Sequence, residues 1–173
     1  MSTRYKIRQK LFSIGDDFWI ENQKGQKIFK VDGKALRLRK TLIFEDMDGN
    51  ELCQIQERWL PIKETMAIDG PDGERMAVVK KALMAPLRDK WGVKVKSGPD
   101  LDVRGDILDH EYAIKHGWNK VAEVSKKWFR LTDTYGVEID PGQNDILILA
   151  IAVAIDMMAH DDDKKGDRDK KDN

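Results

Sequence analysis

The sequence has little of what a secreted, membrane-spanning or nucleic-acid-binding protein requires. Its 173 residues include a single cysteine, so no intrachain disulfide can form. Lysine plus arginine equals aspartate plus glutamate at 31 each, so the overall charge gives no reason to expect a nucleic-acid partner. The first ten residues are polar and basic and lack the apolar stretch of a signal peptide. These absences favour a cytoplasmic protein that is at most peripheral to a membrane.

The motifs of common catalytic and cofactor sites are also missing. The sequence has no glycine-rich phosphate loop and no local signature of a Ser-His-Asp or Cys-His arrangement. His110 and His116 are six residues apart with no third ligand nearby, so we interpret both as surface histidines. Cys53 lies in a strand-like alternation, which indicates a half-buried structural thiol. We therefore predict a protein that is not an enzyme and that needs neither metal nor cofactor.

One long apolar run is present near the end of the chain. Residues 146–155 read ILILAIAVAI, and the run continues through Asp156 to Ala159. A transmembrane helix needs about 20 apolar residues and tolerates a central charge poorly, so we favour a buried core helix over a membrane anchor. Asn144 or Asp145 can cap it, which predicts a helix over 145–159. Asp156 would need a partner there, and we expect a hydrogen bond to backbone at the rim of the fold.

Three earlier segments share one pattern with a fixed spacing. Gly25, Gly49 and Gly73 lie 24 residues apart, and each follows a polar turn-forming cluster with apolar residues on both sides. Glycine supplies the positive φ of a tight turn, so each segment predicts a β-hairpin. Six such units would end at residue 144, just before the apolar run. About twelve strands and one all-apolar helix fit best as a closed barrel with the helix in its bore.

Several blocks of the sequence resemble a known family. The opening YKIRQKL, the turn EDMDGN, and the block TDTYGVEI followed by DILILAIAVAID are similar to the LURP-one-related proteins, which group with tubby C-terminal domains and phospholipid scramblases. The resemblance covers about 4–160 and implies a mainly β fold, a twelve-stranded antiparallel closed barrel around a central C-terminal helix. We expect one such domain over residues 1–160. Residues 161–173 hold only charged and small polar side chains and predict a disordered tail.

The resemblance also implies functions that involve lipids. Tubby domains bind phosphoinositides, and scramblases are linked to calcium-dependent movement of phospholipids. The stretch that matches the scramblase calcium segment, 131–142, has Leu131 and Gly142 where the first and last calcium ligands belong, so we expect no calcium site.

A basic stretch is the best candidate for binding. Strand alternation places Arg37 and Arg39 on one face, flanked by Lys34 and Lys40. Two adjacent guanidinium groups suit a phosphate, which arginine binds bidentately, although an ordinary solvated face remains the alternative. We predict a non-enzymatic module that docks anionic phospholipid or phosphoinositide headgroups, or a protein partner, through its outer surface. The alternative is a scramblase-like protein involved in phospholipid movement.

Overall fold

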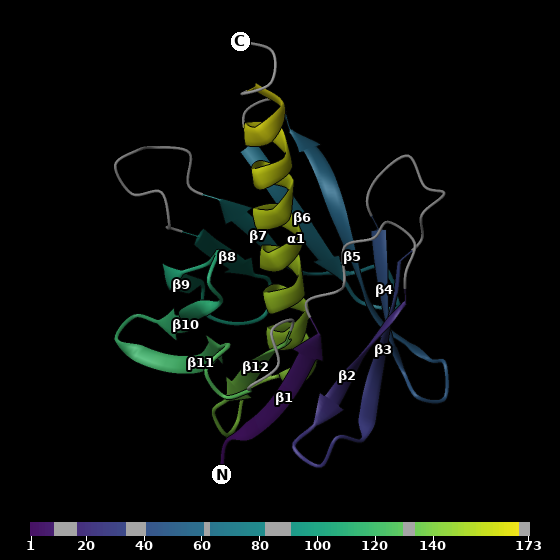
Figure 1. Cartoon of the computed structure of the whole chain (residues 1–173). Coiled ribbons are helices and arrows are strands. Elements are labelled where there is room, and N and C mark those ends of the chain that lie inside the picture. Colours follow the sequence, from purple (N-terminus) through teal and green to yellow (C-terminus); the bar gives the residue numbers. More distant parts are fainter. Residues whose placement is uncertain (9–16, 34–40, 61–62, 82–90, 130–133, 170–173) are drawn as a thin grey trace.

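The protein is represented by a computed structural model that describes residues 1–8, 17–33, 41–60, 63–81, 91–129 and 134–169. These residues form twelve strands followed by one helix (Figure 1). The strands are β1 (Thr3–Arg8), β2 (Phe18–Asn22), β3 (Lys27–Gly33), β4 (Thr41–Asp46), β5 (Glu51–Leu60), β6 (Lys63–Asp69), β7 (Arg75–Lys81), β8 (Trp91–Val95), β9 (Leu101–Asp106), β10 (Glu111–His116), β11 (Asn119–Ser125) and β12 (Thr134–Ile139). The helix, α1, spans Asp145–Asp169.

The strands form one closed antiparallel barrel. Each strand pairs with its neighbours in sequence, and β1 closes the barrel against β12, with Thr3 opposite Ile139 and Arg8 opposite Thr134. Side chains alternate between the bore and the outside, as the two-residue period of a strand requires. On β1, for example, Tyr5 and Ile7 are buried. The predicted fold class, a mainly β closed barrel of twelve strands with one C-terminal helix, is confirmed.

Helix α1 runs through the bore (Figure 1). Residues 149–155 are completely buried, and they form one continuous core with inward side chains of all twelve strands. A helix that is apolar on all sides must be surrounded, and here the barrel wall surrounds it. No helix among the described residues is long and apolar enough to cross a membrane.

The helix begins where the sequence predicts and continues beyond the expected end. Asn144 is its N-cap, because the Asn144 side-chain oxygen accepts a hydrogen bond from the Leu147 N–H at 3.1 Å. The helix runs ten residues past Ala159, into the segment 161–173 for which the composition predicted disorder. In the sequence, Asp161 precedes Lys164 and Lys165, and Asp162 precedes Lys165, at helical spacings of three and four residues, an order that supports a helix.

The 24-residue repeat corresponds to three hairpins with the same backbone geometry. Gly25, Gly49 and Gly73 have φ of 75°, 85° and 80°. In each turn the glycine N–H bonds to the carbonyl three residues earlier, at 3.0, 3.2 and 2.9 Å. The residue at that earlier position also donates its N–H to the carbonyl four residues later. The repeat in the sequence is therefore a repeat of hydrogen bonds.

Because the strands alternate in direction, the barrel has two unlike ends. At one end, here called the start end, α1 begins and short connections join the strands; these are 23–26, 47–50, 70–74, 96–100, 117–118 and 140–144. At the other, the exit end, α1 leaves the bore (Figure 1). The strand ends there are linked through residues 9–17, 34–40, 61–62, 82–90, 107–110 and 126–133.

Candidate functional site

Charge divides unequally between the two ends. The connections at the exit end contain ten lysines and arginines against five aspartates and glutamates. The connections at the start end contain two basic residues against five acidic ones. The connections of a neutral chain are therefore mainly basic in one set and mainly acidic in the other, which the total charge conceals.

The predicted phosphate-binding residues, Lys34, Arg37, Arg39 and Lys40, all belong to the connection between β3 and β4 and lie outside the described residues. Only the strand ends that flank them, Gly33 and Thr41, can be placed, and both lie at the exit end. The binding site itself stays a prediction.

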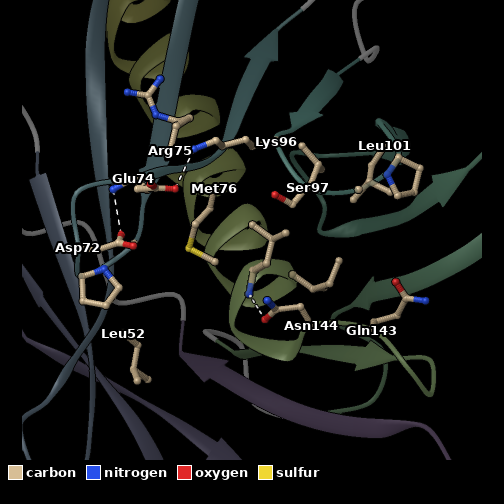
Figure 2. Close-up of a pocket in the computed structure, with 17 residues that line it drawn as sticks. Leu52, Asp72, Glu74, Arg75, Met76, Lys96, Ser97, Leu101, Gln143 and Asn144 are labelled. Carbon is tan, nitrogen blue, oxygen red and sulfur yellow. Dashed lines mark hydrogen bonds and ion pairs between the residues drawn. The ribbon is translucent and has the colours of Figure 1, made fainter.

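A pocket of ≈ 480 Å³, here called the rim pocket, opens at the start end beside the first turn of α1 (Figure 2). It lies between the β6–β7 and β8–β9 connections. Its floor is apolar and includes Leu52, Met76, Leu101 and Leu147. The wall opens here because β8 pairs with β9 only as far as Val93 and Leu101, whereas β8 continues beside β7 to Val95.

Charged groups surround the mouth of the rim pocket. Glu74 and Lys96 form an ion pair of 2.8 Å from opposite sides, as Figure 2 shows. Asp72 accepts a hydrogen bond from the Glu74 N–H at 2.9 Å and forms no ion pair with a described residue. Gly70 stands where the two preceding hairpins have Asn22 and Asp46, and a Cβ there would come within 2.9 Å of the Asp72 carboxylate. The missing side chain thus makes room for Asp72.

A second group of polar residues is buried inside the barrel, toward the exit end. This buried polar cluster consists of His110, Tyr112, Tyr135 and Asp156. The Nε2 of His110 donates to one oxygen of Asp156 at 2.6 Å, and the hydroxyl of Tyr135 donates to the other at 3.2 Å. Burial, reinforced by the charge of Asp156, raises the pKa of both tyrosines well above the ordinary value. The cluster therefore holds α1 to the wall through β12 and the turn before β10.

Two atoms of the buried polar cluster have no hydrogen-bond partner among the described residues. They are Nδ1 of His110 and the hydroxyl of Tyr112. Buried polar atoms of this kind are suitable partners for an ordered water molecule. His110 also has a positive φ of 52°, which is uncommon outside glycine. The cluster offers only one histidine and one carboxylate, and no group of three potential metal ligands occurs within the described ranges.

Comparison with known proteins relates the chain to a family of sequences. The sequence model of the LURP-one-related (LOR) family matches residues 3–156, which include all twelve strands and the first half of α1. The chain belongs to the LURP-one-related family. The match ends at Asp156, so it includes every member of the buried polar cluster.

One curated protein and one solved structure are similar to the chain over most of its length. The uncharacterized protein YxjI of Bacillus subtilis (strain 168) is 29% identical over 157 residues, which cover 91% of this chain and 94% of that protein. The X-ray structure of the Arabidopsis thaliana protein AT5G01750 superimposes with a TM-score of 0.68 at 18% identity and covers 91% of each chain. That likeness concerns the fold alone.

The structure corrects some expectations for single residues of this LURP-one-related protein. The prediction that His110 lies on the surface is wrong, since its side chain is only 2% exposed, whereas His116 is exposed. Asp156 has hydrogen-bond partners, as expected. Two of them, His110 and Tyr135, are side chains of the barrel wall and not the backbone groups that the sequence predicted. Cys53 is fully buried, and burial raises the pKa of its thiol to about 12, so it is not a reactive cysteine.

Proposed function

We propose that this LURP-one-related protein is a non-enzymatic binding module that docks on anionic phospholipid headgroups through the exit end of its barrel. The observation that carries the proposal is the charge difference between the two ends, ten basic and five acidic residues against two and five. Each Lys or Arg near an anionic membrane surface contributes about 1 kcal/mol of attraction. The segment 34–40 supplies four of the ten basic residues.

The filled bore supports a surface function. Residues 149–155 of α1 are completely buried against the wall, so the bore cannot receive a lipid tail without expelling the helix. For the same reason the apolar run is not available for contact with a bilayer, which weakens the scramblase-like alternative. Ligands must meet this protein at its outer surface or at its ends.

Co-sedimentation with liposomes tests the proposal. We expect the protein to sediment with phosphatidylcholine vesicles that contain phosphatidylserine or phosphoinositide, and not with phosphatidylcholine alone. Binding should fall in high salt, because the attraction is electrostatic and screened. Equal sedimentation with neutral vesicles, or binding that ignores salt, contradicts the proposal.

A pair of charge-reversal variants locates the surface. Arg37→Glu/Arg39→Glu changes the exit end by four charge units, and Lys24→Glu/Lys115→Glu makes the same change at or beside the connections of the start end. We expect the first variant to lose vesicle binding and the second to retain it. Loss of binding in both variants would show that net charge alone attracts the protein, and equal retention would place the contact elsewhere.

A further inference from the structure

We propose that the rim pocket at the start end binds a short peptide segment of a partner protein in which an apolar side chain lies beside lysine or arginine. This site goes beyond the proposed lipid function and lies at the opposite end of the barrel. An apolar floor, an acidic surround and a helix terminus that is already capped support it.

The floor of the rim pocket is where the hydrophobic core reaches the surface. Leu52, Met76 and Val95 are only partly buried, yet they pack directly on the core. A ligand that covers them removes apolar surface from water, which is favourable. A volume of ≈ 480 Å³ lies in the range of ordinary ligand pockets and admits one or two side chains, not a folded domain.

The N-terminus of α1 is a poor site for binding an anion. The N–H of Leu147 is bonded to the Asn144 side chain, and the N–H of Ile148 is bonded to the Asn144 carbonyl at 3.0 Å. The Asp145 carboxylate stands in the first turn and offsets the positive end of the helix dipole. A negatively charged ligand in the pocket would therefore find the N–H groups of Leu147 and Ile148 already bonded.

The surroundings favour a cation. Asp72 forms no ion pair with a described residue, whereas Arg75, which also lines the pocket, is paired with Asp69. The short connections at this end carry five acidic residues against two basic ones. Lys96 at the mouth is already paired with Glu74. Electrostatic complementarity of this kind selects partners and steers their approach.

Exposed apolar side chains at the same end extend the surface that a partner could cover. Trp118 is 97% exposed on the β10–β11 connection, and Met47 is 51% exposed on the β4–β5 connection. Aromatic residues and methionine are enriched at protein interfaces. An apolar surface with an acidic surround fits a partner that is both apolar and basic.

Titration of the isotopically labelled full chain with three capped hexapeptides tests the site by NMR. The peptides are KLFKLK, its acidic counterpart ELFELE and its polar counterpart KSSKSK. We expect KLFKLK to cause saturable shifts in the amide signals of Leu52, Met76, Ser97 and Leu147. The other two peptides should bind at least about tenfold more weakly, a difference of 1.4 kcal/mol. Equal binding by ELFELE, or shifts confined to other surfaces, overturns the proposal.

Two variants and a matched control assign the contacts. Asp72→Asn/Glu74→Gln should weaken KLFKLK binding about threefold to tenfold, and Leu52→Lys should weaken it by at least about tenfold. Leu108→Lys changes an exposed leucine at the exit end and should leave binding unchanged. Because Leu52→Lys could disturb folding, the thermal melting of each variant is measured beside the titration. If Leu52→Lys does not fold, the amide pair, Asp72→Asn/Glu74→Gln, decides alone. Unchanged binding by the amide pair and by a folded Leu52→Lys variant overturns the proposal.

Discussion

The two ends of the barrel differ in the charge of their connections and in the polar groups they contain, although the same strands form both. At the start end the connections are short, acidic and built from repeated turns, and the core comes close to the surface in the rim pocket. Toward the exit end the connections are basic, and the bore contains the buried polar cluster. Because α1 occupies the bore, an external ligand can reach the ends and the outer surface of the barrel but not its centre.

Helix α1 allows the two ends to be compared within one element. Near its beginning, Asp145 accepts a hydrogen bond from the hydroxyl of Tyr5 at 2.6 Å in a partly exposed position. Eleven residues later, Asp156 accepts hydrogen bonds from Tyr135 and His110 where no solvent reaches. An aspartate of α1 thus makes a partly exposed contact near one end of the barrel and a buried contact toward the other. The loss in the free energy of unfolding on removal of each aspartate should differ accordingly.

The largest expected effect is that of Asp156→Ala. It leaves the Tyr135 hydroxyl and the His110 Nε2–H buried without an acceptor, and we expect it to lower the free energy of unfolding by about 3–5 kcal/mol. Asp145→Ala removes a tyrosine partner at the start end, where water can replace it, and should cost about 1 kcal/mol. Urea unfolding of both variants measures the difference.

Asp156→Asn serves as the control for this comparison. It retains an acceptor oxygen, so it should cost less than Asp156→Ala. Equal losses for Asp145→Ala and Asp156→Ala would mean that the buried polar cluster contributes no more than a surface contact, and would remove its role in holding α1.

Glycine substitutions provide the next comparison. Gly105 has φ of 133°, and a Cβ there would lie 2.4 Å from the Glu111 carbonyl oxygen and 2.7 Å from the Tyr112 Cα. We expect Gly105→Ala to destabilise the protein by about 2–4 kcal/mol through backbone strain and overlap. Gly49, at the start end, has φ of 85° but no atom within 4 Å of an added Cβ. Gly49→Ala should therefore destabilise the protein only through backbone strain, by about 1–2 kcal/mol.

Gly92→Ala is the neutral reference for this series, because Gly92 has no positive φ and no atom within 4 Å of the added Cβ. Thermal melting ranks the three variants. A Gly105→Ala variant as stable as Gly49→Ala would show that the β9–β10 pair can separate at little cost.

The sequence predicts the parts of this molecule that depend on local patterns. Glycine spacing predicts the turns at Gly25, Gly49 and Gly73, and the apolar run predicts the helix in the bore. It does not predict the buried polar cluster, because His110 and Asp156 lie 46 residues apart and meet only when the barrel closes around α1. Asp156 within an apolar run was the one available signal, and it indicated that a partner exists without identifying it.

The rim pocket was missed for a related reason. Its lining comes from β5, β7, β8 and β9, three connections and the first turn of α1, and none of these segments carries a recognisable motif. Its opening depends on where the pairing of β8 with β9 stops, a detail of register that hydrophobic alternation does not encode.

Alkaline titration should affect both ends through the tyrosines. All three, Tyr5, Tyr112 and Tyr135, have a raised pKa, chiefly because of burial, and the thiol pKa of Cys53 is raised to about 12. Above their ordinary values the unfolded chain loses these protons while the folded chain retains them, so stability falls as the pH rises. Each group should contribute a loss of about 1.4 kcal/mol per pH unit, beginning near pH 9 for Cys53 and near pH 10 for the tyrosines.

Urea midpoints measured from neutral to alkaline pH test this expectation, together with the ultraviolet absorbance of tyrosinate in the native protein. Tyr135→Phe should reduce the alkaline slope by about 1.4 kcal/mol per pH unit, and Tyr5→Phe should do the same at the start end. Ionisation of any tyrosine in the native protein near pH 10 would contradict its burial or its bond to aspartate.

The smallest expected effect concerns the cap of α1. Asn144→Ala removes the side-chain acceptor of the Leu147 N–H, and we expect a loss of about 1 kcal/mol in the free energy of unfolding. Gln143→Ala, one position earlier in the same connection, lines the rim pocket but forms no described hydrogen bond to the helix and should change stability little. Because the uncapped N–H would then face the rim pocket, Asn144→Ala should also bind ELFELE more tightly than the unmodified chain does. An unchanged preference for KLFKLK in that variant would show that the acidic surround, and not the cap, excludes anions from the start end.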